Sequence, residues 1–179
     1  TISDEGRNFA AGMTYGTRPA EHAAEEYADA RLVIMSGWNP VVTHQGTAFP
    51  MALVRAKEGG ARFICIEPRY TESVAAFADQ WIPIIPGTDA ALFMAMAYVI
   101  IDENLNDRPF TDAYALGFDQ FSDYVLGRED GVKKTPGWAE AICGVPAATI
   151  ADLAREYAST KPAILNTGRA AGRAAFGEQ

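Results

Sequence analysis

The chain carries two polar segments whose residue types suit the binding of a nucleotide. The first, residues 67–71 (Glu-Pro-Arg-Tyr-Thr), follows an apolar run directly, and the second, residues 87–89 (Gly-Thr-Asp), comes directly before an apolar stretch with helical periodicity. An acid and an arginine at a strand end, and backbone N–H groups with a carboxylate at a helix start, match the ribose, phosphate and base of a nucleotide. Each segment alone also has a structural interpretation, as a proline turn or a helix cap. Their order and spacing favour a ligand site.

A third segment, residues 36–40 (Ser-Gly-Trp-Asn-Pro), follows another apolar run and completes the set. Gly37 allows a turn that leaves backbone amides for a phosphate. The segment is not a G-x-G-x-x-G fingerprint, and the chain has no P-loop lysine motif. Neither a dinucleotide dehydrogenase nor a P-loop enzyme is therefore supported, and a nucleotide has to be held in another way.

The elements that position these segments follow from hydrophobic periodicity. Short apolar runs predict strands, and apolar residues at helical spacing predict helices between them. Because parallel strands need crossover connections, this alternation predicts an α/β fold, a Rossmann-like and mostly parallel sheet flanked by helices, with a helical insertion before the last strand. The expected strands are 30–35, 62–66, 81–85 and 162–166. The expected helices are 47–58, 73–78, 90–104, 110–115, 118–126, 138–142 and 147–158, with an exposed loop at 127–131.

Composition limits the function classes. A chain of 179 residues that is 49% hydrophobic can bury one core. A net charge of −8 without a cluster of Lys and Arg argues against nucleic acid as a partner. No apolar run reaches the roughly 18 residues that a membrane span needs, and no leader pattern is present. Cys65 and Cys143 stand far apart in apolar surroundings and are expected to be buried, reduced thiols.

Four ordered segments together resemble a known family. They are 33–40 (VIMSGWNP), 59–73 (containing CIEPRYTES), 78–121 (containing IPGTDAALF) and 134–163 (beginning KTPGW). In combination they are similar to the catalytic subunit of the molybdopterin oxidoreductases of the dimethyl sulfoxide reductase family, and most similar to its dimethyl sulfoxide reductases. The resemblance implies a large enzyme whose molybdenum is bound by two molybdopterin guanine dinucleotides. The present chain would be a fragment: residues 1–29 an N-terminal segment whose packing partners are missing, and 30–179 the α/β domain that binds one dinucleotide.

The resemblance also implies roles for individual residues. The 36–40 turn would face the pyrophosphate, with Asn39 as a side-chain donor or acceptor, segment 67–71 would lie along the ribose and phosphates, and Asp89 would read guanine. For Trp38 and Tyr70 simple packing is an equal alternative, and Arg169 is as well explained as a solvated charge. The implied cofactor-binding residues are Ser36, Gly37, Trp38, Asn39, Pro40, Glu67, Pro68, Arg69, Tyr70, Thr71, Gly87, Thr88, Asp89, Thr167, Gly168 and Arg169.

The resemblance places one candidate metal ligand near the start of the chain. Counting back from residues 13–16, Ser3 falls where the S-oxide and N-oxide reductases of the family carry the serine that ligates molybdenum, and Asp4 is the alternative ligand. A Ser-Asp pair is also a common helix cap. With Ser3 as ligand and catalytic residue, the chemistry implied is oxygen-atom transfer from an S-oxide or N-oxide, with the fragment inactive alone. No residue is needed as a nucleophile or proton shuttle.

The family further implies partners in anaerobic respiration. These are a small oxide substrate, an iron–sulfur electron-transfer subunit, and a membrane anchor subunit that places the parent enzyme at the membrane on the periplasmic or extracytoplasmic side. An iron–sulfur cluster, where the parent has one, would lie outside this fragment. The rival hypothesis is a non-catalytic homologue, a structural or nucleotide-binding subunit of an electron-transfer complex; intact 67–69 and 87–89 segments weigh against it.

Overall fold

The computed structural model describes residues 5–16, 23–43, 47–168 and 171–173. The chain divides into two compact units, one formed by residues 1–90 with 161–179 and the other by residues 91–160. The predicted boundary at residue 29 stays a prediction.

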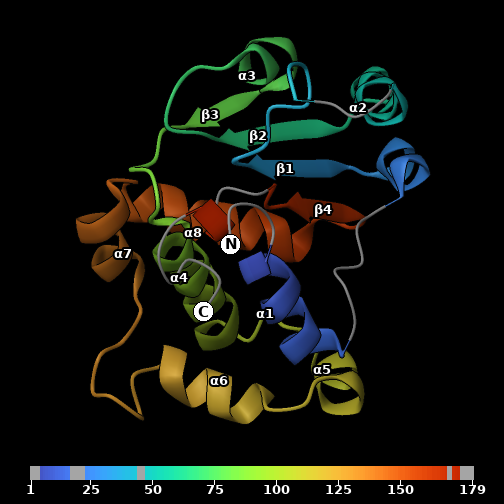
Figure 1. Cartoon of the computed structure of the whole chain (residues 1–179). Coiled ribbons are helices and arrows are strands. Elements are labelled where there is room, and N and C mark those ends of the chain that lie inside the picture. Colours follow the sequence, from blue (N-terminus) through green and yellow to red (C-terminus); the bar gives the residue numbers. More distant parts are fainter. Residues whose placement is uncertain (1–4, 17–22, 44–46, 169–170, 174–179) are drawn as a thin grey trace. The chain divides into compact units, whose positions relative to one another are not determined.

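The first unit is built on a parallel sheet, which confirms the predicted fold class. Its strands, among the described residues, are β1 (Leu32–Ser36), β2 (Arg62–Ile66), β3 (Gln80–Ile82) and β4 (Ala163–Asn166), in the order β3-β2-β1-β4 (Figure 1). Val33 lies opposite Phe63 on one side and Ile164 on the other. The chain thus moves outward from β1 to β3 and then places β4 on the other side of β1. Because every pair is parallel, the strands end at the same edge of the sheet.

Strand β3 is shorter than the sequence predicts. The apolar run continues to Ile85, but the strand ends at Ile82. Pro83 follows, and a proline has no N–H to donate to the ladder. The residues after it turn away toward α4 instead of extending the sheet.

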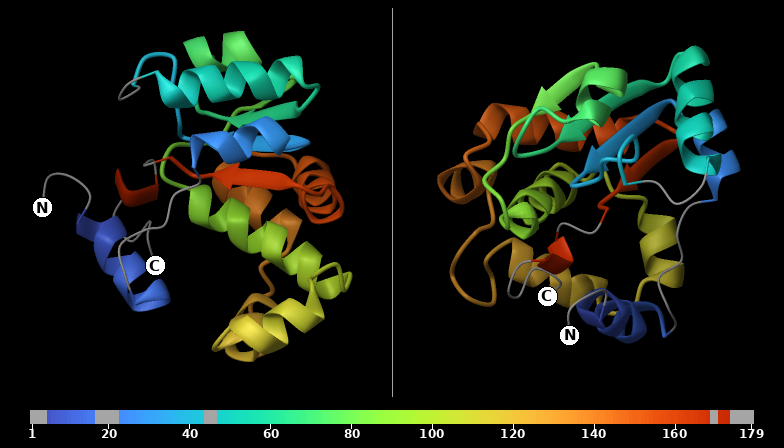
Figure 2. Two further views of the ribbon diagram at one scale, coloured as in Figure 1. Left: turned by 90° about the vertical axis from the view of Figure 1, so that its right-hand side faces the viewer. Right: turned by 45° about the horizontal axis from the view of Figure 1, so that its top comes forward.

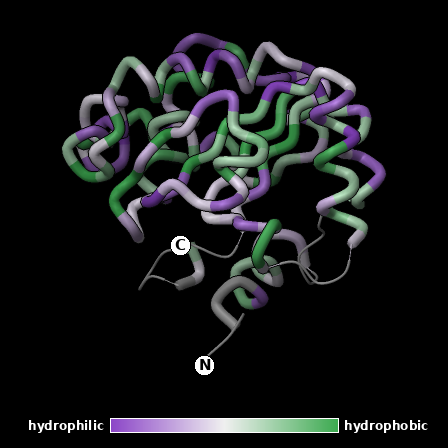
Figure 3. The backbone as a smooth tube through the Cα atoms, turned by 90° about the horizontal axis from the view of Figure 1, so that it is seen from above, coloured by the Kyte–Doolittle hydropathy of each residue, from purple (hydrophilic) through white to green (hydrophobic). Residues whose placement is uncertain are grey.

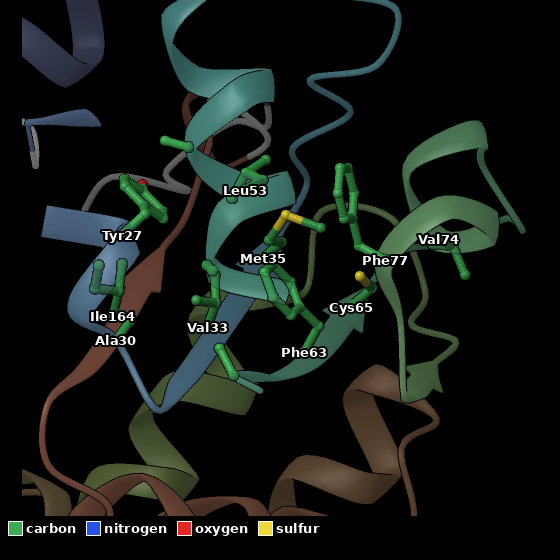
Figure 4. Close-up of a cluster of buried hydrophobic side chains, with 13 residues drawn as sticks. Tyr27, Ala30, Val33, Met35, Leu53, Phe63, Cys65, Val74, Phe77 and Ile164 are labelled. Carbon is green, nitrogen blue, oxygen red and sulfur yellow. The ribbon is translucent and has the colours of Figure 1, made fainter. Parts of the chain in front are cut away.

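Helices α2 (Ala48–Glu58) and α3 (Glu72–Phe77) cover one face of the sheet, as two further views show (Figure 2). The 3-10 helix η1 (Ala24–Asp29) packs against α2. Three strand side chains that point to this face, Val33, Met35 and Phe63, are fully buried beneath Leu53 of α2 (Figure 4). A tube coloured by hydropathy shows the green apolar segments running through the interior (Figure 3). Helix α1 (Glu5–Tyr15), η1 and the short η2 (Ala171–Arg173) were not predicted from periodicity.

The second unit contains the predicted helical insertion. Its helices are α4 (Asp89–Asp102, which begins in the first unit), α5 (Arg108–Tyr114), α6 (Phe118–Val125), α7 (Pro136–Cys143) and α8 (Ala147–Ser159). Side chains cap two of them, because Asp107 accepts from the Phe110 N–H and Thr135 accepts from the Trp138 N–H. Helices α7 and α8 pack together. Leu92, Val99, Ile150 and Leu153 are among the buried residues of the unit.

Candidate functional site

The predicted site segments follow the strands at one edge of the sheet. Residues 36–40 include the end of β1, residues 67–71 follow β2, and Thr167 and Gly168 follow β4. The strand order changes direction at β1, because β2 and β3 lie on one side of it and β4 lies on the other. Open α/β sheets bind ligands at the carboxyl ends of the strands at such a switch point. The whole candidate site lies within the first unit.

Asp89 joins this edge through a buried hydrogen bond. The Ser36 hydroxyl donates to the Asp89 carboxylate, with 3.3 Å between Oγ and Oδ1, and the two residues are 0% and 6% exposed. Asp89 begins α4, where the exposed N–H groups of the first turn and the helix dipole stabilise negative charge. The preceding turn is closed by the Thr88 hydroxyl, which donates to the Ile85 carbonyl at 2.6 Å, and by Gly87 with φ +80°. Sequence distance hides this contact, because 53 residues separate Ser36 from Asp89.

Glu67 is a second buried carboxylate at the same edge. It is 7% exposed, and its Oε1 has no hydrogen-bond partner within the described residues. Burial raises the pKa of Glu67, and the Asp89 carboxylate raises it further, while the Trp38 N–H and the Arg69 guanidinium lower it. A buried acceptor without a donor costs free energy, so the arrangement fits a ligand that brings a hydroxyl or N–H group.

The loops after β1 and β4 touch at two glycines. Gly37 and Gly168 have φ values of +59° and +53°. A Cβ on Gly168 would lie 2.4 Å from the Gly37 carbonyl oxygen, closer than a real Cβ can approach. Only glycine therefore lets the β4 loop lie this close to the β1 loop. Asn166 shapes the same turn, since its Oδ1 accepts from the Gly168 N–H at 2.8 Å and its Nδ2 donates to the Tyr27 hydroxyl at 2.8 Å.

The backbone amides of the β1 loop have partners inside the protein. The Gly37 N–H donates to the Ile66 carbonyl at 3.1 Å, and the Val41 N–H donates to the Ser73 hydroxyl at 3.1 Å. The Trp38 backbone N–H lies close enough to Glu67 to lower the pKa of its carboxyl. These contacts hold the loop, and the expected role of this turn toward a pyrophosphate stays a prediction.

Two predicted aromatic residues differ in their surroundings. The Trp38 ring packs against Tyr27 and Phe49, with centroid distances of 6.0 Å to each. These contacts agree with the alternative that Trp38 simply packs. Tyr70 is 61% exposed and meets Trp81 edge-on at 5.3 Å. The Trp81 Nε1 donates to the Glu67 carbonyl at 2.9 Å, which ties this aromatic pair to the candidate site.

The remaining predicted residues fall into three groups. Thr71 is buried and caps α3, because its hydroxyl accepts from the Val74 N–H. Pro40 is buried, whereas Pro68, Arg69 and Thr167 are exposed. Ser3 and Arg169 lie outside the described residues.

Two contributors escaped the sequence analysis. Ser73, on α3, forms hydrogen bonds with both Asn39 and Val41. Asn166 accepts a hydrogen bond from Gly168 and so orders the turn that contains it. Neither belongs to a recognisable ligand motif. Ser73 directly follows the Thr-Glu start of α3, and that position near a strand end was the one available signal.

With fold and site described, the family follows from the sequence match. Residues 6–178 match the molybdopterin oxidoreductase family, and the chain belongs to it. It is 42% identical to the dimethyl sulfoxide reductase DmsA of Escherichia coli K12, over 97% of this chain and 23% of that protein. It is 40% identical to the dimethyl sulfoxide/trimethylamine N-oxide reductase of Cereibacter sphaeroides, over 69% of this chain and 15% of that protein.

A solved structure supports the fold independently. The acetylene hydratase from Pelobacter acetylenicus superimposes with a TM-score of 0.73 at 26% identity, covering 93% of this chain and 21% of that one. The chain therefore spans about a fifth of the length of these relatives. Family membership implies a molybdopterin cofactor.

Two further observations concern the predictions made from composition. Cys65 and Cys143 are both buried, as expected, and burial raises the pKa of Cys65 to about 12. Among the described helices, none combines the length and apolar character needed to cross a bilayer.

Proposed function

We propose that this chain is the region of a larger S-oxide or N-oxide reductase that binds the guanosine and pyrophosphate end of a molybdopterin guanine dinucleotide. The observation that carries the proposal is the pair of buried carboxylates, Glu67 and Asp89, at the carboxyl edge of a parallel sheet. The similarity to dimethyl sulfoxide and trimethylamine N-oxide reductases supports the substrate class.

The residues at this edge fit the parts of such a cofactor. The Glu67 carboxylate, with its unpartnered Oε1, suits a ribose hydroxyl. The Asp89 carboxylate suits the guanine N1–H and amino group, a donor pair that adenine lacks. The exposed Arg69 and the N-terminus of the 14-residue helix α4 suit phosphate oxygens. These residues would bind and orient the cofactor.

The catalytic step belongs to the cofactor and to the parent protein. When bound, molybdenum supplies the two-electron chemistry that removes oxygen from the oxide substrate. Ser3 remains our predicted metal ligand. An iron–sulfur electron-transfer subunit and an extracytoplasmic membrane anchor remain proposals for the parent enzyme.

The test is guanine-nucleotide binding by the 179-residue chain. We expect the wild-type chain to bind GDP more tightly than ADP. Asp89→Ala should weaken GDP binding by about 1.5–3 kcal/mol, or ten- to a hundredfold, because guanine loses a charged acceptor. Asp102→Ala, at the exposed end of the same helix, is the matched control and should bind like the wild type. Binding can be followed by NMR amide shifts, with thermal unfolding confirming that each variant is folded.

Two results would count against the proposal. Equal affinity for GDP and ADP, unchanged by Asp89→Ala, would remove Asp89 from base recognition. Absence of nucleotide binding in a folded wild-type chain would instead favour the structural form of the rival hypothesis, a homologous subunit that does not bind a nucleotide.

A further inference from the structure

Ser73 is a buried residue of α3 that contacts the β1 loop at two points. It is 1% exposed. Its hydroxyl donates to Asn39 Oδ1 at 2.6 Å and accepts from the Val41 N–H at 3.1 Å. Its own backbone N–H also donates to Asn39 Oδ1, at 3.2 Å. One side chain thus fixes both ends of the segment 39–41.

The side chain of Asn39 is committed to α3. Its amide oxygen has two lone pairs, and the Ser73 hydroxyl and N–H use both. Its amide nitrogen donates to Glu72 Oε2 at 3.0 Å, a contact that lowers the pKa of Glu72. Asn39 therefore has no acceptor lone pair left for a ligand, although its residue type suggested a direct contact.

Helix α3 offers a firm attachment for this network. Val74 and Phe77 bury their side chains in the core of the first unit, and the close-up shows Phe77 near Cys65 (Figure 4). The helix start is capped by Thr71. A hydroxyl on such a helix can hold a loop more firmly than a contact to solvent or to another loop.

Two residues just before the segment 39–41 lie against the buried acids. The Ser36 hydroxyl donates to the Asp89 carboxylate, and the Trp38 backbone N–H lies close enough to Glu67 to lower the pKa of its carboxyl. The backbone joins these two residues directly to the segment that Ser73 holds, so the position of residues 36–41 affects both acids. All of these residues belong to the first unit.

We propose that Ser73 is a positioning residue of the nucleotide site, which acts through Asn39 and Val41 to set the β1 loop and thereby Glu67 and Asp89. Asn39 then serves as part of this support and not as a ligand contact. The inference rests on the proposed function for its ligand, but its structural half can be measured without one.

The first measurement is amide hydrogen exchange in the chain without nucleotide. Ser73→Ala and Asn39→Ala should each speed exchange at Val41 and its neighbours, and the double variant should be little worse than either single one, because both remove the same support. Ser159→Ala, which removes a hydroxyl from α8 in the other unit, should leave the β1 loop unchanged. Unchanged loop exchange in Ser73→Ala would overturn the proposal.

The second measurement is GDP affinity in the same variants. Each single variant should bind about two- to tenfold more weakly, the loss expected for one intramolecular hydrogen bond, and the two losses should not add in the double variant. Ser73→Thr, which keeps the hydroxyl, should restore most of the affinity. Fully additive losses would mean that Asn39 meets the nucleotide directly and would overturn the proposal.

The two readouts separate the two hypotheses. If Ser73→Ala does not fold, amide exchange and GDP affinity are measured in the Asn39 variants. Asn39→Asp serves as the conservative variant, because it keeps the oxygen that accepts from Ser73. A wild-type chain that does not bind GDP would defeat the proposed function, and the exchange data would then decide the positioning role on their own.

Discussion

Glu67 is a buried acid whose surroundings differ from those of a surface carboxylate. The Trp38 backbone N–H and the exposed Arg69 guanidinium lower the pKa of its carboxyl, and the Asp89 carboxylate raises it. Burial nevertheless dominates, since it favours the neutral form and raises the pKa. A site that keeps such a group without a ligand sacrifices stability for binding.

This gives a pH-dependent prediction for Glu67→Gln. An acid whose pKa is raised by folding destabilises the folded state when it ionises, so the wild type should lose stability as the pH rises above its ordinary pKa of 4.5. We therefore expect the Gln variant to have a higher free energy of unfolding than the wild type at pH 7. The difference should shrink as the pH falls below 4.5.

Urea unfolding across this pH range measures the difference. Glu58→Gln, at the exposed end of α2, is the control and should follow the wild type. A Glu67→Gln variant that is less stable than the wild type at neutral pH would show that the ionised carboxylate has partners the structure does not reveal.

Gly168 supports a second prediction at the scale of one residue. Gly168→Ala is strained in two ways, because the backbone is left-handed and the new Cβ would lie 2.4 Å from the Gly37 carbonyl oxygen. Gly60→Ala meets a similar backbone, φ +87°, but open space. We expect the Gly60 variant to lose about 1–2 kcal/mol of stability from the backbone alone, and the Gly168 variant to lose more.

Thermal unfolding of both variants isolates the close contact between the two loops. Equal losses would mean that the β1 and β4 loops do not touch in solution. GDP affinity should fall only in the Gly168 variant, because Gly60 lies at the opposite end of β2 from the site.

The α6–α7 connection shows how an irregular element can be held by one buried side chain. Lys134 is 2% exposed, its Nζ donates to the Val132 carbonyl at 2.7 Å and forms an ion pair with Asp130. The same ammonium group lies 4.2 Å from the centroid of the Tyr124 ring. Gly127 opens the turn with φ +73°, where a Cβ would lie 2.6 Å from the Lys133 backbone nitrogen.

We expect Lys134→Met to destabilise the chain by about 1–3 kcal/mol. The substitution keeps the apolar stem but removes the cation from Tyr124 and leaves the Val132 carbonyl without its donor. Lys133→Met is a close control, since the neighbouring lysine is exposed and of the same type. Chemical denaturation measures the free energy of unfolding of the two variants. Equal losses in both would show that Lys134 does not hold the α6–α7 connection.

At the scale of the whole molecule, the share of its relatives' length that the chain spans limits what the chain can do alone. It spans about a fifth of the length of the relatives that it matches. A metal held between two dinucleotides needs contacts from other parts of such a protein, because a site has to be fixed by a rigid surrounding shell. We propose that the carboxyl edge of the sheet in this chain binds one of the two dinucleotides.

We therefore predict that the purified 179-residue chain neither retains molybdenum nor reduces dimethyl sulfoxide with a reduced dye, whereas the longer parent protein does both. Metal analysis and a dye-oxidation assay on the two proteins provide the measurement. Stoichiometric molybdenum and turnover in the short chain would overturn the assignment of this chain to one part of the site.

The sequence by itself determined the fold class and the order of its elements. Apolar runs of five residues, interrupted by amphipathic stretches, specify buried strands with crossovers, because burial on both faces leaves few other arrangements. The same periodicity gave the helices between residues 108 and 144, which lie in the unit 91–160, and the apolar surroundings of the two cysteines indicated that they are buried. It also placed segments 36–40 and 67–71 at one edge, since parallel strands end together.

The tertiary structure decided which polar groups meet. Ser36 and Asp89 are 53 residues apart, and Ser73 reaches Asn39 across 34 residues, so local sequence carries no trace of either hydrogen bond. It also showed that the amides of Gly37 and Val41 already have acceptors, which residue types alone cannot reveal. The physical reason is that hydrogen bonds and desolvation depend on distances of a few ångströms, whereas periodicity specifies only which face of an element is buried.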